Sequence, residues 1–150
     1  MPFITTTVDL SHHMPPRNDL ATLTLPVIYD ADGIHHVARA GMITDGATVS
    51  RALWRIVPPF RTPYLAAAMI HDHYCYKSMT LPADSPERYS LRLANDGLFR
   101  VMCAELGASV AMQAFLYQAV RLGSLASQKS PSIPDYEREP AAFLDWRLAQ

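Results

Sequence analysis

Cysteine is scarce in this chain, which has two among its 150 residues, Cys75 and Cys103. Both occur in apolar segments, so we expect small buried hydrophobic residues and a reducing compartment rather than a disulfide framework. An excess of one charge is missing as well, because 13 basic residues nearly balance 14 acidic ones. Since nucleic acid is bound by clustered positive charge, we predict no nucleic-acid partner.

Long apolar runs are also absent from the sequence. A membrane-spanning helix needs about 18 or more apolar residues in succession, so we predict no transmembrane segment. We find no charged-then-apolar leader and expect no secretion signal. With 49% hydrophobic residues, the chain still has enough apolar side chains for the core of one domain.

The first 40 residues have the pattern of β-strands. The segment 2–10 alternates with a period of two and is rich in β-branched residues, which predicts a strand. The segments 20–29 and 34–40 are the arms of a predicted hairpin, with a turn at 30–33 that contains a glycine. We therefore expect a small antiparallel β-structure at the N-terminus.

Three later segments combine a helix start signal with an apolar helical pattern. We expect these helices to begin at Thr62-Pro63, Ser85-Pro86 and Ser109, and the last two to end at Gly107 and Gly123. Short connections favour antiparallel packing of successive helices. The predicted fold class is α+β, with N-terminal antiparallel strands and three main helices.

The C-terminal part of the chain has a different composition. Residues 124–139 are rich in Ser, Pro and charge, as in a linker, and 140–148 form a predicted short amphipathic helix. We therefore divide the chain into a single α+β domain at 1–123 and a linker with a short helix at 124–150. That helix would pack on its own domain or on a second copy, giving a homo-oligomer through the termini.

His71 and Asp72 are adjacent residues among Ala, Met and Ile in the first predicted helix. Burying such a pair is costly unless polar partners or a function need it. Successive helical positions point about 100° apart, so one residue can hold a metal while the other transfers a proton. The alternative without function is a hydrogen-bonded core histidine beside a surface carboxylate.

Two further carboxylates are candidates for the same site. Asp96 follows Asn95 in the second helix, and both are poor helix formers beside an apolar stripe, which indicates that a side chain is needed there. We expect Asp96 to meet His71, although a solvated helix face is the alternative. Asp45 lies in a loop of oxygen-bearing side chains, which would suit calcium together with Asp72, unless the loop is only a turn.

Four ordered segments carry a resemblance to a known family. They are TDGAT at 44–48, AAMIHD at 67–72, RLANDGLF at 92–99 and YQAVRLG at 117–123. The set resembles the phage and prophage family called domain of unknown function 1353. This resemblance implies a phage-encoded protein, such as a tail or lysis-region component, in the virion or host cytoplasm. Ser50 stands where the family usually has Pro, and Cys75 where it usually has Tyr.

A more distant resemblance connects the helix of His71 with phospholipase A2, especially its disulfide-free viral forms. It implies that His71 is a general base for water, that Asp96 orients the imidazole and that Asp72 is a calcium ligand. A base beside a cation that polarises an ester carbonyl is a complete hydrolytic set. The segment 41–46 resembles the calcium loop only loosely, and the Tyr that supports the second Asp falls on Cys75.

The function expected from the sequence is that of a virion structural or assembly protein. In it His71, Asp72, Asp45 and Asp96 would form a buried polar or metal site, and other phage structural proteins would be partners. The alternative is a calcium-dependent, phospholipase A2-like esterase acting on membrane lipid. A zinc-dependent cell-wall hydrolase using His71, Asp72 and His73 is disfavoured, because adjacent and i+2 helical positions do not converge on one ion.

Overall fold

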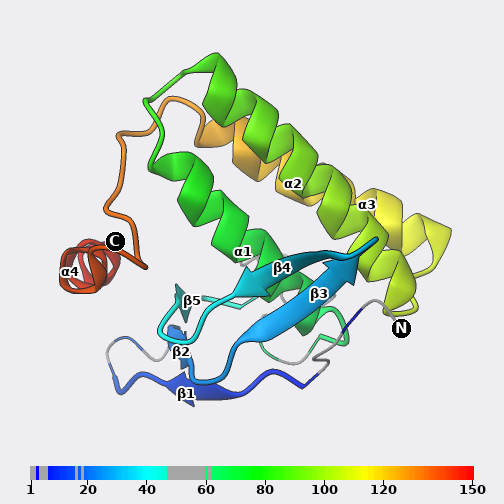
Figure 1. The fold of residues 1–150 in the computed structure, drawn as a ribbon, viewed down its shortest axis with the longest axis horizontal. Helices are drawn as coiled ribbons and strands as arrows, with labels where there is room; N and C mark the ends of the chain where they lie inside the picture. Colours follow the sequence, from blue (N-terminus) through cyan, green and yellow to red (C-terminus); the bar gives the residue numbers. More distant parts are fainter. Residues whose placement is uncertain (1–2, 4–6, 16, 18, 47–59, 61) are drawn as a thin grey trace.

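Strands occupy the N-terminal part of the chain and helices the rest, which confirms the predicted α+β class (Figure 1). The computed structural model describes residues 3, 7–15, 17, 19–46, 60 and 62–150. The elements are β1 (Leu10–His12), β2 (Ala21–Leu23), β3 (Val27–Ala31), β4 (Ile34–Ala38), β5 (Ile43–Thr44), α1 (Leu65–Met79), α2 (Pro86–Glu105), α3 (Val110–Ala126) and α4 (Pro140–Leu148). No helix in this described part could cross a membrane, since none is both long and apolar enough.

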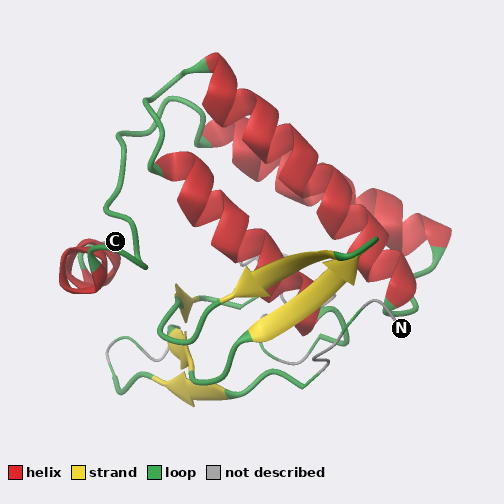
Figure 2. Cartoon of the chain, viewed as in Figure 1, coloured by secondary structure: helices red, strands yellow, loops and turns green. Residues whose placement is uncertain are grey.

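The strands form two small antiparallel sheets, visible in yellow in Figure 2. In one sheet β2 lies between β1 and β5, and in the other β3 and β4 form the predicted hairpin. At the hairpin turn Asp32 has φ 52° and Gly33 has φ 81°. Two successive left-handed residues make a type I′ turn, whose twist matches that of the strands it joins.

The strands are shorter than the sequence pattern predicts. The expected strand 20–29 is divided into β2 and β3 at Pro26, which has no N–H to donate to a strand ladder. The expected strand 2–10 overlaps β1 only at its last residue, and part of it lies outside the described residues. Phe3 makes an isolated antiparallel bridge to Tyr29.

The first helix, α1, begins later than predicted. Thr62 Oγ1 accepts a hydrogen bond from the N–H of Tyr64 at 3.2 Å, and the Thr62 carbonyl accepts one from the N–H of Leu65 at 3.3 Å. Thr62 and Pro63 therefore form a turn before the helix rather than its cap. The alanines at 66–68 are buried, so their small side chains allow close packing around α1.

The starts of α2 and α3 lie where the sequence predicts them. The Oγ atoms of Ser85 and Ser109 each accept the backbone N–H three residues later, at 3.2 and 3.1 Å. α2 ends at the predicted glycine: Gly107 has φ 93° and donates its N–H to the carbonyl of Ala104. Local capping signals thus fix both ends of the helix that carries the site's carboxylate.

The predicted end of α3 at Gly123 is wrong, because the helix continues past this residue. A glycine inside a helix costs only about 1 kcal/mol relative to alanine. The next residue, Ser124, donates a hydrogen bond to Asp96 at 2.7 Å, which holds the last turn of α3 against α2. The division of the chain into 1–123 and 124–150 stays a prediction.

The three long helices lie side by side and alternate in direction (Figure 1). α1 packs against α2 and also contacts the β3–β4 hairpin, and α2 packs against α3. This arrangement confirms the predicted antiparallel packing of the helices that carry His71 and Asp96. It places α1 between the strands and the other two helices.

The C-terminal helix docks on the chain's own α1 through an aromatic cluster of Tyr76, Tyr136, Phe143 and Trp146. The Phe143 ring is 4.8 Å from the ring of Tyr76, 5.7 Å from that of Tyr136 and 5.5 Å from that of Trp146, measured between centroids. Phe143 is 1% exposed. Because this helix covers one side of the cavity described below, its docking affects the site.

Replacing Phe143 with alanine should lower the free energy of unfolding by about 3–5 kcal/mol, the usual cost of removing a buried phenylalanine ring. Leu144 is the matched control, because it is the next residue of α4 and is 38% exposed. Its replacement by alanine should cost clearly less. Urea unfolding of both variants measures the difference, and equal losses would contradict the docking of α4 through Phe143.

Candidate active site

His71 on α1 and Asp96 on α2 form a buried pair. The distance from His71 Nε2 to Asp96 Oδ1 is 2.8 Å, and the two residues are 3% and 0% exposed. The other ring nitrogen, Nδ1, lies 3.5 Å from the sulfur of Cys75, one helical turn later in α1. The predicted contact between the two helices is therefore present, while its catalytic role stays a prediction.

The second oxygen of Asp96 is held by α3. Asp96 Oδ2 accepts hydrogen bonds from Arg121 Nη1 at 2.8 Å and Ser124 Oγ at 2.7 Å. Both donors lie on α3. The phospholipase resemblance instead implies a supporting Tyr on α1, at the position of Cys75. Sequence reasoning missed both donors, and the only signal was a charged residue, Arg121, in a helix otherwise low in charge.

Electrostatics make this pair an ion pair. Burial raises the pKa of Asp96, but the hydrogen bonds from His71 and Ser124 and the charge of His71 outweigh it, so the pKa is lowered. Burial lowers the pKa of His71, but the charge of Cys75 and the hydrogen bond to Asp96 raise it to about 10. Both shifts favour a protonated His71 ring beside an ionised Asp96.

Asn95 also takes part in joining α2 to α1. Its Nδ2 donates to the backbone carbonyl of His71 at 3.0 Å, and Asn95 itself is 3% exposed. The alternative of a solvated helix face at Asn95 and Asp96 is thus wrong. Two poor helix formers stand in mid-helix because both side chains bond across to the neighbouring helices.

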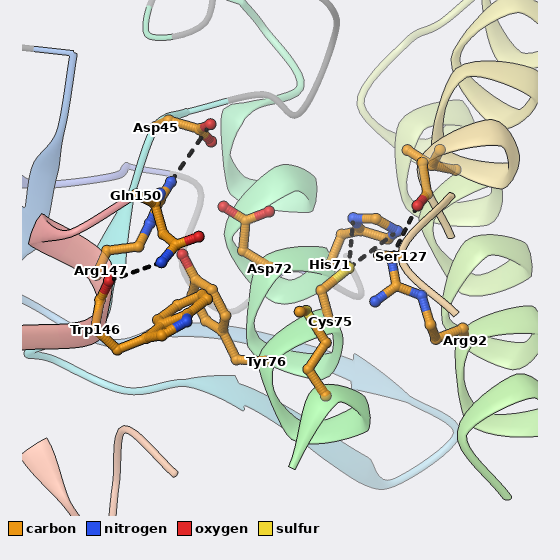
Figure 3. Close-up of a pocket in the computed structure, with 13 residues that line it drawn as sticks. Asp45, His71, Asp72, Cys75, Tyr76, Arg92, Ser127, Trp146, Arg147 and Gln150 are labelled. Carbon is orange, nitrogen blue, oxygen red and sulfur yellow. Dashed lines mark hydrogen bonds and ion pairs between the residues drawn. The ribbon is translucent and has the colours of Figure 1, made fainter. Parts of the chain in front are cut away.

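A cavity of about 330 Å³ lies beside the pair (Figure 3). Residues of α1, α2, α3 and α4 and the residue after β5 contribute to its walls. The lining residues are Asp45, His71, Asp72, Cys75, Tyr76, Met79, Arg92, Val120, Gly123, Ser127, Trp146, Arg147 and Gln150. The cavity thus collects three of the four residues predicted for the site, with Asp96 directly behind His71.

Asp72 and Asp45 lie on the strand side of this cavity. Asp72 Oδ2 accepts a hydrogen bond from Thr44 Oγ1 at 2.6 Å, and Asp45 Oδ2 is 3.5 Å from Arg147 Nη2 of α4. Among the described residues no three His, Cys, Asp or Glu side chains are grouped to hold a metal. The guanidinium of Arg147 already supplies a positive charge to Asp45, so we assign no step to a metal, and the calcium site stays a prediction.

The two cysteines and His73 differ in their surroundings. Cys103 is buried as expected, but Cys75 is partly exposed and lines the cavity, so the expectation of a buried residue is wrong for Cys75. His73 has another partner, because its Nδ1 lies 2.6 Å from the hydroxyl of Tyr136. Burial lowers the pKa of His73 to about 4, so His73 is neutral at pH 7.

The site thus defines an α+β protein with a His–Asp pair held by three helices beside a cavity. Residues 21–120 match the model of a family described as protein of unknown function (DUF1353), and the chain belongs to this family. No curated protein and no solved structure gives a significant match. The family description gives no activity, so a function has to be argued from the site.

The ion pair should make stability depend on pH in a defined direction. Because the pKa of His71 is raised from 6.5 to about 10, its contribution is present below pH 6.5 and is lost as the pH rises toward 10. Urea unfolding of wild type and His71→Asn should therefore differ more at pH 6 than at pH 9.5, by up to about 1.4 kcal/mol per pH unit.

The exposed His35 is the control for this measurement. It pairs with Asp30 on the surface, where its side chain is 59% exposed, and an exposed pair contributes little to stability. The change His35→Asn should give nearly the same small difference at both pH values. A difference between wild type and His71→Asn that stayed constant with pH would contradict the buried imidazolium.

Proposed function

We propose that this protein is a hydrolase of carboxylic esters, with lipid-like substrates as in phospholipase A2, and that His71 and Asp96 are its proton-transfer pair. The observation that carries the proposal is the placement of one edge of an oriented, buried imidazole in the wall of a 330 Å³ cavity. Groups with shifted pKa values that converge on a cavity are typical of active sites.

Each residue of the pair has a defined role in this mechanism. Asp96 binds Nε2 and fixes the ring, which leaves Nδ1 on the side of Cys75, a residue that also lines the cavity. His71 takes a proton from water at Nδ1 as the water oxygen bonds to the ester carbonyl carbon. The imidazolium then returns this proton to the departing alkoxide, and the products are an acid and an alcohol.

The replacement His71→Asn should remove hydrolysis while the fold survives. Asn keeps a hydrogen-bonding group but no base, so the rate on mixed phospholipid vesicles should fall by a factor of about 10² or more. The assay is run with and without calcium, since Asp72 and Asp45 are the proposed calcium ligands. Circular dichroism checks folding, and His35→Asn should hydrolyse as wild type does.

The absence of hydrolysis by wild type under both conditions would contradict the hydrolase function for these lipids. Hydrolysis by His71→Asn at the wild-type rate would leave the activity but remove His71 from it. The two results are distinguishable because each concerns a different protein in the same assay.

The role of Cys75 can be tested through the pH dependence of the rate. A general base works when it is unprotonated, so the wild-type rate should rise with pH as the His71 ring, whose pKa is raised to about 10, loses its proton. The charge of Cys75 is the largest influence that raises this pKa. The change Cys75→Ala should therefore move the rise in rate to lower pH.

Two other outcomes of the Cys75→Ala experiment would be informative. Complete loss of activity would contradict water activation, because it would make the Cys75 sulfur the nucleophile. An unchanged pH profile would mean that the titrating group is not His71. Folding of the variant is verified by its urea unfolding curve.

A second candidate is the structural or assembly role of a phage or prophage protein, in the virion or host cytoplasm. It is favoured by the protonation of the site, because a ring that is an imidazolium at neutral pH is an ion-pair partner rather than a base. In that case His71→Asn would lower stability by about 1–3 kcal/mol with no turnover to lose. Contacts with other phage proteins, or with a second copy through the termini, belong to this candidate.

A further inference from the structure

We propose that Arg92 is an anion-binding residue of the cavity, and that it binds a phosphate or carboxylate group attached to an apolar chain. This inference deepens the proposed hydrolase function, because the anionic group would belong to its substrate. Arg92 lies on α2, four residues before Asp96, and lines the same cavity as His71. It would bind the substrate and has no part in the transfer of the proton.

Arg88 lies one helical turn before Arg92 on the same face of α2 and has a different set of partners. Arg88 is 0% exposed, and its two terminal nitrogens donate to five backbone carbonyls at 2.6 to 3.4 Å. These carbonyls belong to Met79, Leu81, Ser127, Gln128 and Ser130. Arg88 therefore has a structural role that joins the end of α1 to the end of α3.

Arg92 is also buried but is left with unused donors. It is 6% exposed, and the hydrogen bond found for it among the described residues is one from Nη1 to Ser78 Oγ at 3.3 Å. Its Nε is buried and has no partner in that part of the chain, as is also true of Arg88, so the two arginines differ in the hydrogen bonds of their terminal nitrogens. A guanidinium has five N–H donors, and leaving even one of them buried without an acceptor is unfavourable.

The position of Arg92 in the cavity indicates what could satisfy it. Figure 3 shows Arg92 on the same side of the cavity as His71, with Asp45 and Arg147 on the opposite side. The carboxylate of Asp45 is thus paired away from Arg92. A guanidinium binds phosphate and carboxylate through two parallel N–H donors, so an oxyanion fits the unused donors.

The rest of the wall indicates an apolar chain next to that anion. Met79, Val120 and Trp146 line the cavity together with Arg92. At about 330 Å³ the cavity has the volume of a small-ligand site. An oxyanion bound at Arg92 would lie against a positive charge, and its hydrocarbon chain would lie against apolar side chains.

Three probes distinguish the contribution of the anionic group from that of the hydrocarbon chain. Isothermal titration at pH 7 with inorganic phosphate, hexyl phosphate and hexanol should give binding by hexyl phosphate, weaker binding by phosphate and the weakest by hexanol. Equal binding of phosphate and hexyl phosphate would contradict the apolar part of the proposal. Failure of both phosphates to bind wild type would overturn the anion site.

Two variants on α2 test the residue itself. Arg92→Gln should weaken the binding of hexyl phosphate by about tenfold or more, because the charged fork is lost. Arg100 is the matched control, since it is exposed on the same helix and contacts the Tyr117 ring at 5.6 Å. Arg100→Gln should bind as wild type does, and unchanged binding by Arg92→Gln would overturn the proposal.

A measurement on the wild-type protein keeps the test valid if Arg92→Gln does not fold. The Nε–H signal of Arg92 in a nitrogen-15 NMR spectrum should shift on addition of hexyl phosphate, and an unmoved signal at saturation would overturn the site. These probes contain no carboxylic ester. Binding without phospholipid hydrolysis would therefore contradict the proposed function alone, and hydrolysis without anion binding would contradict Arg92 alone.

Discussion

The buried carboxylate of Asp96 determines how the helices are placed. Its two oxygens accept hydrogen bonds from His71 on α1 and from Arg121 and Ser124 on α3. An ionised group that is 0% exposed persists only with such partners, because taking a charge out of water is costly. Since these partners lie on α1 and α3, the single carboxylate on α2 fixes how each of these two helices is rotated about its axis. The hydrogen bond to Asp96 also fixes the orientation of the His71 ring.

The features of this arrangement that could be predicted are encoded by short sequence patterns, each only a few residues long. Ser85 and Ser109 are followed by apolar helical patterns, and each caps its helix as expected. The meeting of His71 with Asp96 could be predicted as well, because both are polar residues on apolar faces of consecutive antiparallel helices. Local chemistry together with short connections was sufficient for these features.

The parts that could not be predicted depend on how far each helix is rotated and tilted. A single arginine in a helix is compatible with solvent, so the sequence does not assign the roles of Arg92 and Arg147, and the low charge of its helix is the only signal for Arg121. The predicted end of α3 was wrong for a related reason. Gly123 would end the helix if the next residues had no tertiary contact, but Ser124 donates a hydrogen bond to Asp96. Such contacts between distant segments outweigh local propensity.

The cavity is lined both by α1 and by Trp146 and Arg147 of α4, which lie far apart in the sequence. A chain is synthesised from its N-terminus, and its early parts fold first. The helices that carry His71 and Asp96 therefore leave the ribosome before α4, and until α4 follows, the walls that Trp146 and Arg147 supply are missing. A ligand whose binding depends on contacts with α4 would therefore bind the completed protein but not the growing chain.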